Sequence, residues 1–369
     1  MTIIIAAGGT GGHLYPGVAL AREFLRTDPS ATIRFIGTRR GIEGKVLPHE
    51  GFALDYIAAL PLMGLSLRQR LAALLSLPRG LWQSVRLLRR HHADLVLAIG
   101  GYTSPPVVLA ACLLRIPRVI LEPNAYPGMA NKILAPLANR VFVAFDATAS
   151  FFKPSKVRAF GAPIRREFFE SSARTPSLSG DEDRKTLLVF GGSGGAHAIN
   201  LAMMEALPLI FRDATVSARL SVIHQTGQHD YERVKGFYES AGIKVDVRPF
   251  LFDMPTALHT ADLVVCRSGA MTLAELTVCG KPSVLIPFPN AIYQHQAHNA
   301  EVLRKAGAAL VIPQRELTGE KLADVIGSLL RDPRRLGQMS ERSRALQRTD
   351  SAQAIVRDCV QLIKGKARG

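Results

Sequence analysis

The stretch TIIIAAGGTGGH, from Thr2 to His13, runs an apolar segment directly into a glycine-rich turn. A second stretch of the same design, KTLLVFGGSGGAH, follows past the midpoint of the chain, from Lys185 to His197. Glycines let the backbone turn tightly and leave its N–H groups uncovered, and the helix that follows directs the positive end of its dipole at the turn. Each stretch therefore predicts a strand, an anion-binding turn and a helix, and the pair predicts two nucleotide-type domains.

A longer repeat supports two similar halves. The segment Ala93–Val96 has a counterpart in Ala261–Val264, and Pro117–Asn124 has one, in the same order, in Pro282–Asn290. Strands buried on both faces of a parallel sheet read as short continuous apolar runs, and helical patterns separate these runs here. Any two doubly wound domains would look alike in this way, but that alternative leads to the same fold. We therefore expect an α/β protein of two Rossmann-like domains whose parallel sheets face each other across a deep cleft.

The size and charge of the chain fit two domains and an anionic partner. The 369 residues are 47% hydrophobic, which allows two cores, and 46 Lys and Arg against 30 Asp and Glu give a net charge of +16. An excess of this size limits the partners to polyanions, anionic lipid surfaces or phosphorylated small molecules. With one Trp and seven Tyr, the chain offers no aromatic stacking platform, so we expect no nucleic-acid partner.

The cysteines and the apolar runs indicate a cytosolic protein that stays outside the bilayer. The four cysteines lie far apart without a Cys-x-x-Cys pair, so we expect neither disulfides nor a thiolate metal site. The chain begins in a predicted strand without a charged leader, which argues against a signal peptide. The longest apolar run, Val107–Leu114, is far shorter than the about 20 residues that span a bilayer.

The segment Leu60–His92 interleaves apolar residues with arginines and contains no acidic residue. Its leucines recur at helical spacing, so helices that pack on a sheet and expose a basic face explain it as well as a binding surface does. The loop Pro61–Leu65 favours the binding surface, because its apolar residues would lie at the protein surface beside arginines. Such a surface suits shallow insertion into an anionic leaflet, and we expect peripheral membrane attachment through this segment.

Three positions in these motifs carry groups suited to chemistry. His13 follows the backbone donors of the first turn and can accept a proton near neutral pH, which favours a base over a residue that only caps or packs at the helix start. Ser193 lies among glycine N–H groups suited to a diphosphate. Glu275 falls about two turns into a predicted helix, where a carboxylate can accept both hydroxyls of a ribose or simply pair at the surface. His197, at the matching turn of the second half, is expected only to pack.

The segment Asn290–Ala300 is rich in amides and imidazoles, groups that suit the hydroxyls of a sugar. His295 and His298 also suggest a metal, but no carboxylate or thiolate nearby completes a site. An Asp-x-Asp pair can also hold Mg²⁺ or Mn²⁺, but the candidate at Asp181–Asp183 lies in a polar stretch that is expected to be an exposed linker. We therefore expect no obligatory metal and no other cofactor.

Six motifs that occur in order over nearly the whole chain define its family resemblance. They are Gly8–His13, Glu122–Asn124, Gly161–Arg165, Gly191–Ala196, Arg267–Glu275 and Gln294–Ala300. Together they resemble the bacterial undecaprenyldiphospho-muramoylpentapeptide β-N-acetylglucosaminyltransferases, the lipid II synthases of peptidoglycan synthesis. The resemblance implies a GT-B fold and an inverting transfer of GlcNAc from UDP-GlcNAc to the muramoyl 4-hydroxyl of lipid I. It also implies a peripheral location at the cytoplasmic face of the inner membrane, with the cell-wall and division machinery as partners.

The same resemblance implies roles for single residues. His13 would be the base for the acceptor hydroxyl, Glu275 would hold the ribose, and Leu251 would bind uracil through its backbone. Arg165 would assist Ser193 and the glycines around it at the diphosphate. The other implied positions of the UDP-GlcNAc site are Thr10, Gly11, Gly12, Asn124, Ala270, Met271, Thr272, Leu273, Ala274 and Gln296.

The motifs also divide the chain. We place an acceptor-binding and membrane-associating domain at residues 1–160, a hinge at 161–168 and a UDP-GlcNAc-binding domain at 169–340. The closing segment 341–369 has an apolar helical face, and the resemblance returns it to the first domain. Two other functions stay open. A UDP-GlcNAc 2-epimerase-like enzyme of the same fold would have less use for the basic segment Leu60–His92. A non-catalytic basic protein that binds nucleic acid or membranes would leave the paired glycine turns unexplained.

Overall fold

The computed structural model describes residues 1–8, 11–39, 41–60, 67–170, 184–192 and 194–366, with backbone only at 67–76, 170 and 292. The chain divides into two compact units. Unit 1 consists of Met1–Arg165 together with Asp350–Gly369, and unit 2 consists of Arg166–Thr349. The C-terminal segment is therefore part of the unit that begins the chain.

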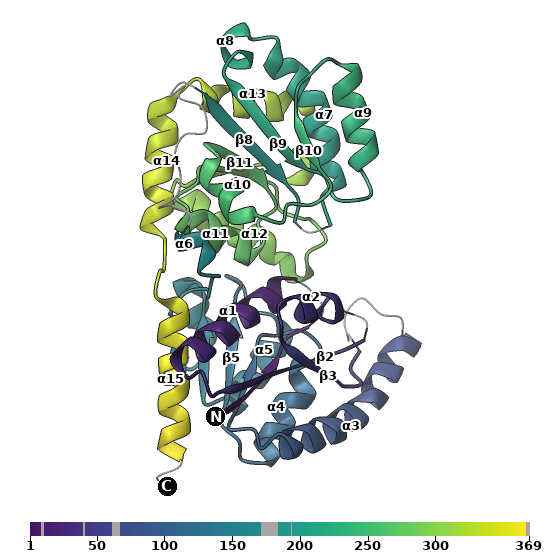
Figure 1. The fold of residues 1–369 in the computed structure, drawn as a ribbon, viewed down its shortest axis with the longest axis vertical. Helices are drawn as coiled ribbons and strands as arrows, with labels where there is room; N and C mark the ends of the chain where they lie inside the picture. The colour runs from purple at the N-terminus through teal and green to yellow at the C-terminus, as the bar shows by residue number, and fades with distance from the viewer. Residues whose placement is uncertain (9–10, 40, 61–66, 171–183, 193, 367–369) are drawn as a thin grey trace. The chain divides into compact units, whose positions relative to one another are not determined.

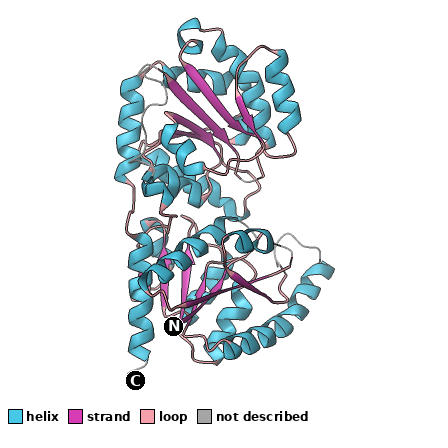
Figure 2. Ribbon diagram, viewed as in Figure 1, coloured by secondary structure: helices cyan, strands magenta, loops and turns pink. Residues whose placement is uncertain are grey.

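Unit 1 is built on a seven-stranded sheet in the order β3-β2-β1-β4-β5-β6-β7, in which all neighbouring strands are parallel (Figure 2). Its strands are β1 (Thr2–Ala6), β2 (Thr32–Gly37), β3 (Ala53–Tyr56), β4 (Leu95–Ala98), β5 (Arg118–Glu122), β6 (Arg140–Val143) and β7 (Val157–Arg158). Its helices are α1 (Gly11–Thr27), α2 (Glu43–His49), α3 (Leu67–Arg90), α4 (Ser104–Leu113), α5 (Met129–Leu134) and α15 (Ser351–Lys366), with 3-10 turns η1 (Ala135–Leu137) and η2 (Asp146–Phe151).

Both faces of this sheet are covered, which explains the unbroken apolar run of β1. Ile3 and Ile5 point into a core that is shared with α1 and α15, whereas Ile4 points into a second core shared with α3 and α4. Strands that are buried on both faces lose the alternation of apolar and polar residues. Helix α15 buries Ile355 and Cys359 in the first of these cores and packs along α1 (Figure 1).

Unit 2 repeats the design with a six-stranded parallel sheet in the order β10-β9-β8-β11-β12-β13. Its strands are β8 (Lys185–Phe190), β9 (Leu220–Gln225), β10 (Asp246–Arg248), β11 (Leu263–Cys266), β12 (Ser283–Leu285) and β13 (Ala309–Val311). Its helices are α6 (Glu167–Glu170), α7 (His197–Phe211), α8 (Ala214–Ser217), α9 (Tyr231–Ser240), α10 (Met254–Thr260), α11 (Ala270–Val278), α12 (His295–Lys305), α13 (Gly319–Leu330) and α14 (Pro333–Ala345), with 3-10 turns η4 (Ile292–Gln294) and η5 (Gln314–Glu316).

In each sheet the first strand of the unit lies in the interior, and later strands are added on both of its sides. Strand β1 lies between β2 and β4, and β8 lies between β9 and β11. In such sheets ligands bind beyond the carboxyl ends of the strands, at the point where the strand order reverses. The two glycine-rich turns follow β1 and β8, so each lies at such a point. The predicted pair of parallel-sheet Rossmann-like domains is confirmed, while the cleft between them stays a prediction.

Three further features bear on the expectations from sequence. In the described part of the chain, no helix combines the length and the apolar character needed to cross a membrane. Cys266, Cys279 and Cys359 are free thiols, and all three are buried. The predicted boundary at residue 340 falls inside α14, and the closing helix α15 begins at Ser351.

Candidate functional site

His13 lies in the first turn of α1, directly after the first glycine-rich turn. A Cβ built on Gly100 would lie 3.3 Å from His13 Nε2, so the imidazole packs against the backbone of the turn that follows β4. Gly100 has a φ of +100°, a conformation that other residues rarely adopt. The imidazole therefore sits where the turns after β1 and β4 meet. Gly11 and Gly12 begin α1 beside His13, while Thr10 lies outside the described residues.

A buried carboxylate positions Asn124. Glu122 ends β5, is 1% exposed, and accepts hydrogen bonds from the backbone N of Asn124 at 2.9 Å and from its Nδ2 at 3.1 Å. It also accepts from the backbone N of Gly128 and from Nδ2 of Asn131, each at 2.9 Å. Burial raises the pKa of Glu122, although all of these hydrogen bonds favour the charged form and oppose the rise. The carboxylate thus holds the half-buried Asn124 at the end of the strand.

Asn131 connects Asn124 with His13. A Cβ built on Gly100 would lie 3.4 Å from Asn131 Nδ2, so this amide and the imidazole of His13 pack on the same turn. The structure therefore brings His13 and Asn124, both predicted from sequence, to one edge of the sheet. Sequence reasoning assigned no role to Glu122 or Asn131. The signal that could have found Glu122 is an acidic residue at the carboxyl end of a strand whose central residues, Val119–Leu121, are apolar.

A second buried carboxylate, Glu43 in α2, joins the turns after β1, β2 and β4. It is fully buried and accepts from the backbone N of Thr38 at 2.8 Å and from Thr38 Oγ1 at 3.2 Å. The same Oγ1 lies 3.2 Å from the Tyr102 hydroxyl. A Cβ built on Gly8 would lie 2.8 Å from Glu43 Oε1, so the first glycine-rich turn starts in direct contact with this carboxylate. No sequence pattern marked Glu43, because its partners come from three separate turns.

The second glycine-rich turn lies against the turn that follows β9. Gly195 has a φ of +76°, and a Cβ built there would overlap the carbonyl oxygen of Thr226. A Cβ built on Gly194 has no atom within 4 Å. The turn leads into α7, whose N-cap residue Ala196 forms no side-chain cap. The first N–H groups of α7 therefore remain suited to an anion. Ser193 lies outside the described residues.

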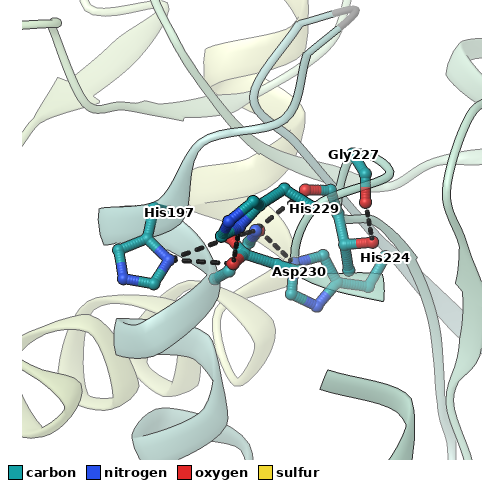
Figure 3. Close-up of polar contacts among 7 residues, drawn as sticks. His197, His224, Gly227, His229 and Asp230 are labelled. Carbon is teal, nitrogen blue, oxygen red and sulfur yellow. Dashed lines mark hydrogen bonds and ion pairs between the residues drawn. The ribbon is translucent and has the colours of Figure 1, made fainter. Parts of the chain in front are cut away.

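Asp230 gathers three side chains next to this turn (Figure 3). It is 5% exposed and accepts from Nδ1 of His197 at 2.9 Å, from Nδ1 of His229 at 3.1 Å and from Nδ2 of Asn200 at 2.7 Å. Burial alone would raise the pKa of Asp230, but the hydrogen bonds from Asn200, His229 and His197 outweigh it and hold the pKa at about 2. His197 therefore pairs with a carboxylate, which the sequence did not indicate.

Asn200 ties this network to the glycine-rich turn. Its Nδ2 also donates to the carbonyl oxygen of Thr226 at 2.9 Å, the atom against which Gly195 packs. Its Oδ1 lies 3.1 Å from Nε2 of His224, and the other ring nitrogen of His224 lies 3.2 Å from the Tyr238 hydroxyl. Full burial lowers the pKa of His224 to about 3, so this imidazole is neutral at physiological pH.

The buried His224 should make the protein sensitive to acid. In the unfolded chain a histidine becomes protonated below about pH 6.5. In the folded protein the pKa of His224 is about 3, so its imidazole stays neutral down to about that pH. Stability should therefore fall as the pH drops through this window, by about 2 kcal/mol between pH 7 and pH 5 from this group. Urea unfolding at both pH values should show this loss in the wild type and a smaller loss in His224→Gln. An equal loss in the two proteins would contradict the assignment.

The turns after β11 and β12 carry the other predicted site residues of unit 2. Helix α11 begins after Gly269 with Ala270, Met271 and Leu273 buried and with Thr272, Ala274 and Glu275 half-buried. Ser268 Oγ donates to the carbonyl oxygen of Gln296 at 2.8 Å, and Gln296 Oε1 accepts from the backbone N of Phe288 at 2.9 Å. The structure therefore places Gln296 next to the start of α11, where its Nε2 is suited to donate to a ligand.

Arg267 connects these turns through hydrogen bonds, a role that sequence reasoning did not assign. It is 9% exposed and donates to the carbonyl oxygen of Ile286 at 3.0 Å and to Oε1 of Gln314 at 2.7 Å. Desolvation lowers the pKa of Arg267 to about 10, so the group stays charged. It thereby links the ends of β11 and β12 to the segment after β13.

The remaining predicted residues are Leu251 in unit 2 and Arg165 at the end of the first part of unit 1. Leu251 is buried, between the more exposed Phe250 and Phe252, whose ring centroids lie 4.9 Å apart. Arg165 closes the first part of unit 1, with its guanidinium 5.3 Å from the ring centroid of Tyr15 in α1. In the described part of the chain no group of three or more His, Cys, Asp and Glu side chains could hold a metal ion.

The basic segment forms α3, and it is divided between core and surface. Leu88 is buried, whereas Trp82 is 61% exposed with the guanidinium of Arg86 5.7 Å from its ring centroid. Helix α4 packs against both α3 and α5, and it exposes Leu113 by 67%, while α5 exposes Ile133 by 66%. Sequence reasoning missed these two residues, and the loop Pro61–Leu65 lies outside the described residues.

Comparison with known proteins identifies the family of the chain. The model of the glycosyltransferase family 28 N-terminal domain matches residues 3–143, and that of the C-terminal domain matches residues 186–355. A Geobacter sulfurreducens protein named UDP-N-acetylglucosamine–N-acetylmuramyl-(pentapeptide) pyrophosphoryl-undecaprenol N-acetylglucosamine transferase is 45% identical over 360 residues, which cover 98% of both chains. A protein of the same name from Geobacter metallireducens is 46% identical over 96% of this chain and 97% of its own.

Solved structures agree with this assignment. The crystal structure of Acinetobacter baumannii MurG matches with a TM-score of 0.78 and 29% identity over 98% of this chain and 99% of that one. A putative UDP-N-acetylglucosamine 2-epimerase from Listeria monocytogenes matches with a TM-score of 0.69 but only 14% identity, over 96% of this chain and 94% of that one, and so shares the fold alone. The chain belongs to the family of UDP-N-acetylglucosamine–N-acetylmuramyl-(pentapeptide) pyrophosphoryl-undecaprenol N-acetylglucosamine transferases, within glycosyltransferase family 28.

Proposed function

We propose that this protein transfers GlcNAc from UDP-GlcNAc to the muramoyl 4-hydroxyl of undecaprenyl-pyrophosphoryl-MurNAc-pentapeptide, lipid I, and thereby forms lipid II. The observation that carries the proposal is the near-full-length identity of about 45% to transferases of that name. Each unit also carries a glycine-rich turn at the switch point of its sheet. Such a turn suits a diphosphate, and the donor and the acceptor each carry one. The 2-epimerase alternative has only a shared fold in its favour.

Unit 2 is proposed to hold the donor. Backbone N–H groups of the turn around Ser193 and the start of α7 would bind the diphosphate, assisted by Arg165. Glu275 would accept the ribose hydroxyls, and the backbone of Leu251 would bind uracil. The amide of Gln296, oriented by its hydrogen bond to the backbone N of Phe288, would donate to a GlcNAc hydroxyl.

Unit 1 is proposed to supply the acceptor site and the base. The acceptor 4-hydroxyl oxygen would form a bond to the anomeric carbon of GlcNAc from the face opposite UDP, while the bond from that carbon to the β-phosphate oxygen breaks. The hydroxyl proton would pass to the imidazole of His13, and the configuration of the carbon would invert. Charge that develops on the departing UDP would be stabilised by Arg165 and by the N-terminus of α7.

The proposed donor role of Glu275 gives the first test. Turnover of labelled UDP-GlcNAc with a lipid I analogue should persist in Glu275→Ala, while the KM for UDP-GlcNAc rises at least tenfold, because two hydrogen bonds to a charged group are lost. Glu239→Ala, which removes a glutamate from the surface of α9, is the matched control and should behave as the wild type. An unchanged KM in Glu275→Ala would remove this residue from the donor site. If the protein epimerised UDP-GlcNAc in the absence of an acceptor, the proposed transferase function would be wrong and the epimerase function would take its place.

Attachment to the cytoplasmic face of the inner membrane is proposed for the surface formed by α3, α4 and α5. Its support is the exposure of Trp82, Leu113 and Ile133 on a chain with a net charge of +16. The double variant Trp82→Ser/Leu113→Ser should float with vesicles of 30% phosphatidylglycerol several-fold less than the wild type. Flotation equal to that of the wild type would place the membrane contact elsewhere.

A further inference from the structure

A basic pocket lies at the edge of the unit 1 sheet opposite to His13 and Asn124. It has a volume of about 420 Å³ and is formed by the amino-terminal ends of β5 and β6 and the last turns of α15. Arg118 and Arg140 begin the two strands, and Lys366 ends the helix. Because parallel strands all run in the same direction, this edge is far from the turns that carry the proposed chemistry.

The lining of this pocket has more positive charge than its single carboxylate can balance. Arg115, Arg118, Arg140 and Lys366 line it, and Asp358 is the one acidic residue among its lining groups. The Asp358 carboxylate is already shared, at 3.4 Å from Nε of Arg140 and at 3.7 Å from Nε of Arg158. Both distances exceed those of a charge-assisted hydrogen bond. The positive charges of Arg115, Arg118 and Lys366 are therefore not balanced within the pocket and repel one another, and a bound anion would relieve this repulsion.

The arginines are held in place by the backbone. Arg118 donates through one terminal nitrogen to the carbonyl oxygen of Ile116 at 3.1 Å, and Arg140 donates in the same way to that of Asn139 at 3.0 Å. Each planar guanidinium has further N–H groups in a fixed orientation. Within the described chain, Nε of Arg118 is buried without a hydrogen-bond acceptor. A binding site that is oriented in advance loses little side-chain entropy when a ligand binds.

Apolar contacts dock α15, and of the pocket's four cations only Arg140 forms an ion pair with the helix, through Asp358. The helix is fixed by its buried residues Ile355, Val356 and Cys359 in the core shared with α1. A lysine in the last turn of a helix offsets the helix dipole, which explains Lys366. The same effect does not explain Arg115, which precedes β5 and has a φ of +55°, a backbone conformation that an arginine rarely adopts.

We propose that this pocket binds the phosphate group of a small polar phosphate ester, either free or as the headgroup of a lipid. Guanidinium forks match the oxygen atoms of a phosphate better than any other common anion donor set. The amide of Gln361 in the same lining suits a hydroxyl of the organic part. The volume is within the range of pockets for small ligands. The exposed Leu113 ends α4 only two residues before Arg115, which places an apolar surface beside the headgroup.

The test uses a double variant that removes charge without removing a described contact. Arg115→Asn removes one charge and introduces a residue that tolerates left-handed backbone. Lys366→Gln removes the charge of an exposed side chain at the end of α15. The control, Arg233→Gln/Lys244→Gln, removes the same charge from the exposed surface of unit 2. Calorimetric titration with sn-glycerol 3-phosphate, and flotation with phosphatidylglycerol vesicles against phosphatidylcholine vesicles, are measured for all three proteins.

We expect the double variant to lose at least tenfold in affinity in one of the two assays, with the control unchanged. Loss in the titration identifies a free phosphate ester as the ligand, and loss only in flotation identifies a lipid headgroup. Equal binding by the double variant and the control in both assays overturns the proposal. UDP-GlcNAc turnover is not a readout of this test, so its result is independent of the proposed transferase activity.

Discussion

Replacing His13 by glutamine is expected to lower kcat by 10²–10⁴-fold while the KM for UDP-GlcNAc changes little. A positioned base contributes this much to a proton transfer, and the donor contacts proposed for Glu275, Leu251 and Gln296 do not involve this side chain. Glutamine fills a similar volume against the backbone of Gly100, so the turn after β4 keeps its packing. Steady-state kinetics with a lipid I analogue measure both constants. His49→Gln, which changes an exposed histidine at the end of α2, is the matched control.

The pH dependence separates a base from a residue that only packs. If the His13 imidazole accepts the acceptor's proton, kcat/KM should fall on the acid side as that imidazole becomes protonated, and the limb should disappear in the variant. A wild-type limb that persists in His13→Gln would assign it to another group. If His13→Gln mainly raised the KM for UDP-GlcNAc and Glu275→Ala mainly lowered kcat, the roles of the two residues would be exchanged.

The sequence predicted the features that depend on local pattern. The apolar runs before Gly8 and Gly191 predicted β1 and β8, because a strand buried on both faces has no alternation. The turns themselves were found because a backbone that bends sharply and approaches another segment needs glycine. His13 ends the first of these turns, whereas Glu275 and Gln296 lie in two other motifs, and the family resemblance of the motifs is what implies the roles of all three residues.

The sequence could not predict the groups that hold those motifs in place. Glu43 reaches Thr38 in the turn after β2, and Glu122 reaches Asn131 across a turn, so neither pair has a spacing that marks it. Asp230 is 33 residues from His197, and their contact exists only because β8 and β9 are neighbours in the sheet. Such contacts are set by tertiary packing, which overrides local preference.

Replacing Gly195 by alanine should cause the largest loss of both stability and donor binding among single substitutions in the second turn. The left-handed backbone at φ +76° disfavours alanine, and its Cβ would overlap the carbonyl oxygen of Thr226. That oxygen cannot withdraw freely, because it accepts a hydrogen bond from Asn200, which Asp230 holds in turn. The strain should cost about 2 kcal/mol or more in the free energy of unfolding.

The displaced turn should also weaken UDP binding at least tenfold, because backbone N–H groups must point at the diphosphate to bind it. Gly194→Ala is the matched control, since a Cβ there meets no atom within 4 Å, and it should retain most of the stability and affinity. Urea unfolding and calorimetric titration with UDP measure the two effects. If Gly195→Ala bound UDP as tightly as the wild type, the glycine-rich turn of unit 2 would not be the diphosphate site, and the donor would have to bind elsewhere in the chain.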